Sequence, residues 1–221
     1  MPIGFTKLCP ESEELLGVER KKMVRAGDEV LRGKLVVARA PRIQMSVEGV
    51  AFLRSSFSRF FQPPTTEKVF LSRPDEYGRR LLNERKVWAM LEALGYQKID
   101  PALLSIEEQV GLFSRVAEIV AVHGSGLANI VFCRGDAKVV EISPANHIGS
   151  AFYAVASRVG LSHRCIIGCE PAMPSILDRA FRNEHPGYYN STIDDLRVPL
   201  RKLANLVDER GEIREHLIDS E

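Results

Sequence analysis

Short segments of strand-forming residues alternate along the chain with segments in which apolar residues recur at helical spacing. Apolar positions three and four apart predict helices over residues 46–61, 79–94, 105–116 and 149–159. We predict strands at residues 34–39, 69–71, 97–99, 118–122, 138–142 and 163–167. Strands separated by helices of this length are joined by right-handed crossovers, which make the strands parallel and place helices on both faces of the sheet. The pattern therefore predicts an α/β fold: a Rossmann-like three-layer domain with a mostly parallel sheet.

Capping residues set several of the predicted helix ends. Ser46 is the expected N-cap of the first helix, and Gly95 is expected to end the helix over 79–94. Ser105 and Glu108 have the spacing of a capping box, which predicts that a helix opens there. A further short helix is expected from Gly126, directly after the strand at 118–122.

The alternation of strands and helices covers only the middle of the chain. We assign residues 34–168 to the Rossmann-like domain, with the strand–helix–strand unit at 118–142 at its centre. Residues 1–33 do not fit the alternation and read as a connecting segment. Residues 169–221 are mostly polar and contain several prolines, so we expect a C-terminal loop followed by a closing helix.

Charge and hydropathy exclude several classes of protein. The chain has 30 Lys and Arg against 29 Asp and Glu, a formal net charge of +1, so nucleic acid is not an expected partner and any anion site must be local. No uncharged stretch reaches the roughly 20 apolar residues that a membrane-spanning helix needs. The first residues lack the basic and apolar regions of a signal peptide. We therefore expect a cytoplasmic protein without an integral membrane segment.

The 4 cysteines, Cys9, Cys133, Cys165 and Cys169, are too few for a disulfide framework in a chain of 221 residues. Cys165 and Cys169 have no second pair of Cys or His at zinc-ligand spacing behind them. We therefore expect buried or half-buried thiols and no bound metal.

A turn of small residues follows the strand at 118–122. A helix that begins there directs its free backbone amides over the end of the strand, where they favour a phosphate group. In the alternative reading, the two glycines only form the turn and let helix and strand pack closely. Asn129 stands where a dinucleotide-binding fingerprint has its third glycine, which argues against a nicotinamide site. The candidate residues of this turn are His123, Gly124, Ser125, Gly126, Leu127 and Asn129.

Two other places could bind parts of a nucleotide. Arg73, Arg79 and Arg80 follow the strand at 69–71, and arginines there can make bidentate contacts to a diphosphate; a solvated, charged helix start is the alternative. Glu141, near the end of the strand at 138–142, could accept hydrogen bonds from a ribose diol, or it could be a surface acid.

Taken in order, these motifs resemble the catalytic domain of family 61 glycosyltransferases. The arginine segment has the form R-x(6)-R-x-x-N-E and ends in Asn83 and Glu84. It is followed by S-I-E-E-Q-V-G-L-F-S with Gln109, then by H-G-S-G-L-A-N-I-V-F, then by V-V-E-I-S-P. The resemblance covers roughly residues 69–168, with weaker similarity over 35–41 and down to about residue 206.

The resemblance implies one lobe of an enzyme of the GT-B type. Such enzymes transfer a sugar from a nucleoside diphosphate donor, here expected to be UDP-linked, to a hydroxyl group of a glycan or protein. They usually invert the anomeric centre and need no essential metal or other cofactor. Relatives include protein N-acetylglucosamine transferases, plant xylosyl and arabinosyl transferases, and bacterial proteins of polysaccharide biosynthesis.

The same resemblance assigns roles to individual residues. Arginines and helix amides would stabilise the charge that develops on the departing β-phosphate. His123 and Glu84 are the candidate catalytic residues. The donor-binding candidates are Arg73, Arg80, Asn83, Gly124, Ser125, Gly126, Leu127, Asn129 and Glu141.

The length of the sequence suggests that this chain contains only one of the two lobes. Two Rossmann-like lobes need roughly 300 residues or more, so we expect this chain to be the donor lobe, with residues 1–33 as a remnant of the acceptor lobe or a connecting segment. A second copy of the chain or a separate acceptor lobe is then an expected partner, and the catalytic base often lies on that other lobe. Two alternatives remain: a nucleotide-binding or interaction module without catalysis, and a dinucleotide-dependent oxidoreductase, which Asn129 disfavours.

Overall fold

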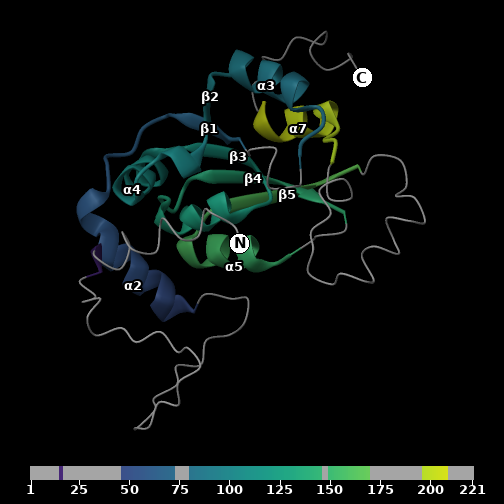
Figure 1. The fold of residues 1–221 in the computed structure, drawn as a ribbon. Coiled ribbons are helices and arrows are strands. Elements are labelled where there is room, and N and C mark those ends of the chain that lie inside the picture. The colour runs from purple at the N-terminus through teal and green to yellow at the C-terminus, as the bar shows by residue number, and fades with distance from the viewer. Residues whose placement is uncertain (1–14, 17–45, 73–79, 146–148, 170–195, 209–221) are drawn as a thin grey trace, which may run out of the picture.

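A computed structural model describes residues 15–16, 46–72, 80–145, 149–169 and 196–208 of the protein. One five-stranded sheet lies at its centre, with strand order β2-β1-β3-β4-β5 and all neighbouring strands parallel (Figure 1). This confirms the predicted α/β class and the parallel sheet. The predicted strand at 34–39 lies outside the described residues. The strands are β1 (Lys68–Leu71), β2 (Tyr96–Ile99), β3 (Glu118–Val122), β4 (Lys138–Pro144) and β5 (Ser162–Gly168).

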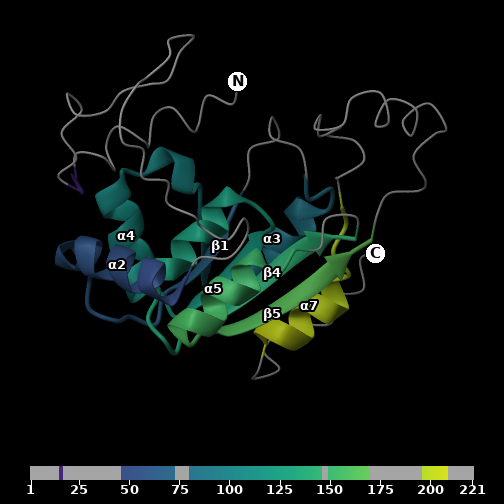
Figure 2. The same cartoon turned by 90° about the horizontal axis from the view of Figure 1, so that it is seen from below.

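Helices cover both faces of this sheet (Figures 1 and 2). Side chains alternate between the faces along each strand, so Ile119 and Ala121 of β3 enter one hydrophobic core while Val120 and Val122 enter the other. The first core is completed by α2 (Val47–Phe57), α4 (Ile106–Arg115), the 3-10 helix η5 (Ser125–Phe132) and α5 (Ala151–Val159). The second core is completed by α3 (Glu84–Ala93) and α7 (Leu200–Val207). Both faces of the three central strands β1, β3 and β4 are therefore buried, which explains their nearly continuous apolar sequences.

The predicted caps are confirmed. The Ser46 hydroxyl accepts a hydrogen bond from the Gly49 amide at 2.9 Å at the start of α2. Ser105 and Glu108 form the capping box of α4, each side chain accepting from the other residue's amide. Gly95, directly after the C-cap of α3, has φ 81°, a left-handed conformation that glycine adopts without a steric penalty.

The predicted start of α3 is wrong, because this helix opens at Glu84 and not at residue 79. The preceding residues pair with a distant segment instead. The Leu82 amide donates to the Leu196 carbonyl at 2.8 Å, and the Leu196 amide donates to the Arg80 carbonyl at 3.0 Å. The Asn83 side chain also bonds to the backbone of Val198. Contacts between residues more than 100 positions apart leave no periodic signal in the local sequence. The helical spacing of the apolar residues therefore predicted a helix that is too long at its amino end.

The cysteines follow the prediction only in part. Cys133 is buried, and burial raises the pKa of its thiol to about 12. Cys165 and Cys169 are exposed, because β5 is an edge strand of the described sheet. Cys9 lies outside the described residues. Within the described ranges, no group of three or more His, Cys, Asp or Glu could hold a metal ion, and no helix has the length and apolar character to cross a membrane.

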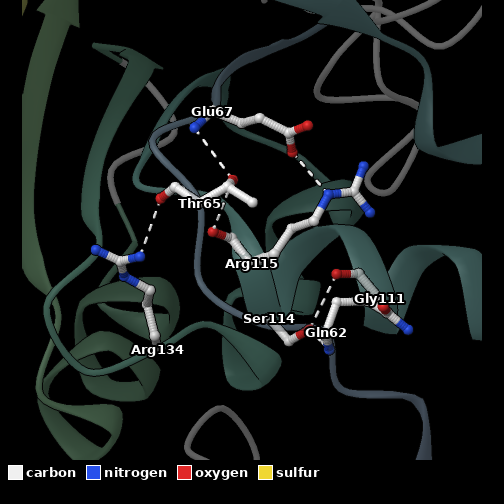
Figure 3. Close-up of polar contacts among 7 residues, drawn as sticks. All are labelled: Gln62, Thr65, Glu67, Gly111, Ser114, Arg115 and Arg134. Carbon is white, nitrogen blue, oxygen red and sulfur yellow. Dashed lines mark hydrogen bonds and ion pairs between the residues drawn. The ribbon is translucent and has the colours of Figure 1, made fainter.

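Polar contacts hold the segment before β1 against the amino end of the sheet (Figure 3). The Thr65 amide donates to the Arg115 carbonyl at 2.8 Å, and the Arg115 Nε atom pairs with Glu67 Oε2 at 2.7 Å. Arg134 donates from Nη1 to the Thr65 carbonyl at 3.0 Å. These contacts link the start of β1 to the starts of β3 and β4. They therefore help to set the register that brings the carboxyl ends of β1 and β3 side by side.

Candidate active site

The strand order creates a switch point between β1 and β3. From β1 the chain continues to β2 on one side, and from β3 it continues to β4 on the other. The helices that follow these two strands, α3 and η5, contribute to the hydrophobic cores on opposite faces of the sheet. Connections that diverge in this way leave a crevice at the carboxyl ends of the strands, which is where open α/β sheets bind ligands. The predicted small-residue turn lies at this edge.

His123 is the first residue after β3. Its backbone amide donates to the Ile142 carbonyl at 2.8 Å, which continues the pairing of β3 with β4 beyond the strand. Its ring Nδ1 atom contacts Glu141 Oε1. The Phe152 ring of α5 packs against the imidazole, with the two ring centroids 5.0 Å apart. These contacts bury the ring, whose side chain is only 9% exposed, and fix its orientation.

Glu141 is a buried carboxylate on β4, with 2% of its surface exposed. Its Oε1 atom contacts His123, and its Oε2 atom lies 2.9 Å from Nε2 of His163 on β5. The alternative reading of Glu141 as a surface acid is therefore wrong. The structure brings His123 and Glu141 together as candidate site residues, and it adds His163, which the sequence analysis did not select. A signal was available, because an acid inside the apolar run of β4 requires buried donors on a neighbouring strand.

The histidines set the protonation state of Glu141. Burial alone would raise the pKa of this carboxyl group, but the hydrogen bonds and charges of His123 and His163 outweigh burial, so the pKa lies below its ordinary value. Glu141 is therefore ionised at neutral pH and can only accept hydrogen bonds. It follows that His123 donates from Nδ1 and His163 donates from Nε2. In a neutral His123 ring, the lone pair then lies on Nε2, on the side of the ring away from Glu141.

The turn after His123 leads directly into η5. Gly124 has extended backbone, with φ 174°, and its carbonyl accepts from the Leu127 amide at 3.0 Å. The Leu127 side chain is buried in the first core and anchors the turn. Ser125 is exposed and Gly126 is half-buried. Their amides open the helix, where backbone N–H groups have no acceptor within the helix.

Asn129 connects this turn to α4. Its Nδ2 atom donates to Gln109 Oε1 at 2.7 Å, and it lies 3.4 Å from the Gly126 carbonyl. Gln109 is itself buried and donates from Nε2 to the Leu104 carbonyl at 3.0 Å. The Asn129 amide group therefore holds η5 against α4. The predicted direct contact between Asn129 and a bound nucleotide stays a prediction.

The arginine segment is described only in part. Arg73 and Arg79 lie outside the described residues. Arg80 is half-buried beside the segment that carries Leu196. The Asn83 side chain donates from Nδ2 to the Val198 carbonyl at 2.8 Å, and its Oδ1 atom accepts from the Val198 amide at 3.1 Å. The amide group of Asn83 thus joins α3 to the strand-like segment before α7.

Glu84 and His123, the two candidate catalytic residues, are not brought together. Glu84 opens α3, and its Oε1 atom pairs with Nζ of Lys98 on β2 at 2.5 Å. Lys98 stands beside Phe70, whose side chain belongs to the core under α3 and α7. His123 and Glu141 lie on the other face, next to α5. The geometry accordingly singles out His123 with Glu141, and it gives Glu84 an ion pair on the opposite face.

A comparison with known protein families gives a match over more than half of the chain. The model of the family described as glycosyltransferase 61 matches residues 20–140. No curated protein sequence matches the chain significantly. The matched residues include the arginine segment and the turn from His123 to Asn129, and they end one residue before Glu141.

Proposed function

The chain belongs to the glycosyltransferase 61 family, and on that premise we propose that it binds a nucleoside diphosphate sugar, UDP-linked, at the carboxyl ends of β1 and β3. As the donor lobe of a GT-B type enzyme, it would transfer the sugar with inversion and without a metal to a hydroxyl group of a glycan or protein. The observation that carries this proposal is the buried His123–Glu141 pair directly before the amides that open η5. In this proposal, a basic group stands beside the turn that would bind the diphosphate.

The donor would be held through its diphosphate. The amides of Ser125 and Gly126 lie at the positive end of η5, and that end attracts a phosphate oxygen. Arg80 lies in the segment that leads from β1 to α3, shortly before the helix, and Arg73 belongs to the same segment in the sequence. Charge builds on the β-phosphate as the bond to the sugar breaks, so amides and guanidinium groups placed there stabilise the transition state more than the ground state.

His123 would act as the general base. In a single inverting displacement, the acceptor oxygen attacks the anomeric carbon while the bond to the diphosphate breaks, and the proton of the acceptor hydroxyl must leave. Nε2 of His123 can take that proton, because Glu141 fixes the ring through Nδ1 and stabilises the imidazolium that forms. Glu141 acts through His123 in this scheme, and its expected contact with the ribose stays a prediction. Glu84 has no role in it.

The direct test is calorimetry of nucleotide binding. We expect UDP to bind the full chain in the presence of EDTA, and with similar affinity when Mn²⁺ or Mg²⁺ replaces EDTA, because amides and arginines supply the positive charge. GDP and NAD are titrated separately as alternative ligands. Binding of NAD alone would favour an oxidoreductase, and binding of UDP only with a metal ion would contradict the metal-independent scheme. Binding of none of the three would favour an interaction module.

Gly126 allows the binding role of the turn to be separated from its packing role. A Cβ atom at this position would lie 3.5 Å from the Pro101 side chain, which is an ordinary contact, so Gly126→Ala should fold with stability within about 1 kcal/mol of wild type. Gly126→Val places a branched side chain where the diphosphate must approach the backbone, and we expect UDP binding to be lost.

Calorimetry and thermal unfolding of both variants check this prediction. Gly160→Ala, which changes a left-handed glycine of φ 88° directly after α5, is a matched control that should lose stability without losing UDP affinity. If Gly126→Val folds and binds UDP with wild-type affinity, the turn is not part of the donor site.

A further inference from the structure

His163 lies under α5, on the same face of the sheet as Glu141. Its Nε2 atom is 2.9 Å from Glu141 Oε2, and its side chain is 6% exposed. The Tyr153 ring of α5 packs edge-on against the imidazole, with the ring centroids 6.2 Å apart. The scheme above uses only Oε1 of Glu141, so it leaves this second histidine without a purpose. His163 also lies beyond the residues that match the family model.

Burying the polar ring of His163 has a desolvation cost that a hydrophobic residue at this position would not have. A buried imidazole must have its polar atoms satisfied, and an apolar side chain of similar size at position 163 would pack under α5 without that demand. Such a replacement would leave Glu141 with a single donor from a side chain. A buried carboxylate with one donor can rotate about its last torsion, and it gains a proton more readily. The second histidine prevents both.

We propose that His163 is a positioning residue for His123: it donates from Nε2 to the second oxygen of Glu141 and so holds that carboxylate, ionised and in one orientation, against Nδ1 of His123. This arrangement fixes which ring nitrogen of His123, the proposed base, carries the proton. As long as Glu141 is an anion it accepts and cannot donate, so Nδ1 of His123 keeps its proton and Nε2 keeps its lone pair. The geometry of the three residues stands by itself, whereas the catalytic purpose of His163 rests on the proposed function.

Among the described residues, the titratable groups that face Glu141 come from two strands. His123 approaches from the end of β3, and His163 and Cys165 approach from β5. The Cys165 thiol is kept protonated, because partial burial beside α5 and the charge of Glu141 raise its pKa to about 11 although the residue is on the exposed edge strand. Tyr153 of α5 packs against the His163 ring. The two histidines are therefore the groups that stabilise the charge of Glu141.

The test is an NMR titration of the Glu141 side-chain carboxyl carbon in the full chain. In wild type, its midpoint should lie below the ordinary value for glutamate. In His163→Leu, the midpoint should rise by about one pH unit or more, because one donor to the anion is lost. His163→Gln keeps an N–H donor at the position of Nε2 and should restore a low midpoint. Cys165→Ala, which stands beside Glu141 in register but donates nothing to it, should leave the midpoint unchanged.

An equal midpoint in wild type and His163→Leu would overturn the proposal. If His163→Leu fails to fold, the wild-type protein still decides, since imidazole nitrogen shifts report the tautomers directly. The proposal requires a proton on Nδ1 of His123 and on Nε2 of His163, and it fails if either ring shows the other tautomer at neutral pH. None of these measurements involves a nucleotide. A protein that passes them and binds no UDP would retain the three-residue arrangement while the proposed function fails.

Discussion

Replacing Glu141 by leucine is expected to lower the free energy of unfolding by about 3 kcal/mol. Leucine removes a buried carboxylate that accepts hydrogen bonds from two histidine rings, and it leaves both rings buried without that partner. Removing one member of a buried charged group typically costs about 3–5 kcal/mol. For a domain of this size, such a loss lowers the thermal midpoint by about 6–12 °C. Urea and thermal unfolding of the two proteins measure the difference.

Two further variants show where that loss comes from. Glu141→Gln keeps the shape of the side chain, and each neutral histidine can change tautomer to suit the amide, so we expect a smaller loss than for leucine. Glu67→Leu breaks an ion pair with Arg115 whose two side chains are 31% and 33% exposed, and it should cost about 1 kcal/mol or less (Figure 3). Equal losses in Glu141→Leu and Glu67→Leu would show that the buried carboxylate has no special weight.

The contribution of Glu141 should also depend on pH. Its pKa is lower in the folded protein than in the unfolded chain, so the folded state binds fewer protons and the carboxylate stabilises the fold above about pH 4.5. That contribution is lost as the pH falls below this value and through the folded pKa. The stability difference between wild type and Glu141→Gln should therefore be largest near neutral pH and shrink in acid. A difference that stays constant from pH 7 to pH 3 would contradict the lowered pKa.

Replacing His123 is expected to have the largest effect on chemistry. His123→Gln keeps a polar side chain next to Glu141 but removes the basic nitrogen, so the rate of UDP release from a UDP-sugar should fall on the order of a hundredfold or more. The affinity for UDP should change little, because the base acts on the acceptor and not on the diphosphate. The rate can be followed by chromatography of UDP released from UDP-N-acetylglucosamine or UDP-xylose, with water or an added sugar as acceptor.

Glu84→Gln is the matched control for His123. Glu84 pairs with Lys98 on the opposite face of the sheet, so its loss should leave the rate of UDP release unchanged. A variant of His123 that loses UDP affinity and keeps its turnover at saturating donor would identify the imidazole as a phosphate-binding group. A strong loss of turnover in Glu84→Gln would reverse the two assignments.

The fold was largely predictable because both faces of the central strands are buried. An apolar run such as that of β3, bounded by a turn of small residues, has few other stable conformations, and its predicted limits match the structure. The capping box at Ser105 was predictable for a similar reason, since its donors and acceptors lie within four residues of one another. Local chemistry of this kind can be read directly from the sequence.

The structure differs from the prediction where distant segments meet. The start of α3 depends on hydrogen bonds from residues 196–198, and no pattern within residues 79–94 carries that information. The candidate site shows the same limit. The sequence identified His123 and Glu141 separately, but their contact follows from the parallel pairing of β3 with β4. His163 joins them only because β5 pairs with the other edge of β4, opposite β3, which the order of segments along the chain does not fix.

The claim that a nucleoside diphosphate binds at the carboxyl end of β3 is tested most directly by NMR of the isotope-labelled protein during a UDP titration in EDTA. We expect the largest amide shift changes at Ser125 and Gly126, which open η5, with changes at His123 beside them. The amides of Lys138 and Ser162 begin β4 and β5 at the opposite edge of the sheet and should not move. Saturating UDP that leaves residues 123–127 unchanged, or that shifts mainly the residues of the amino edge, would contradict the proposed site.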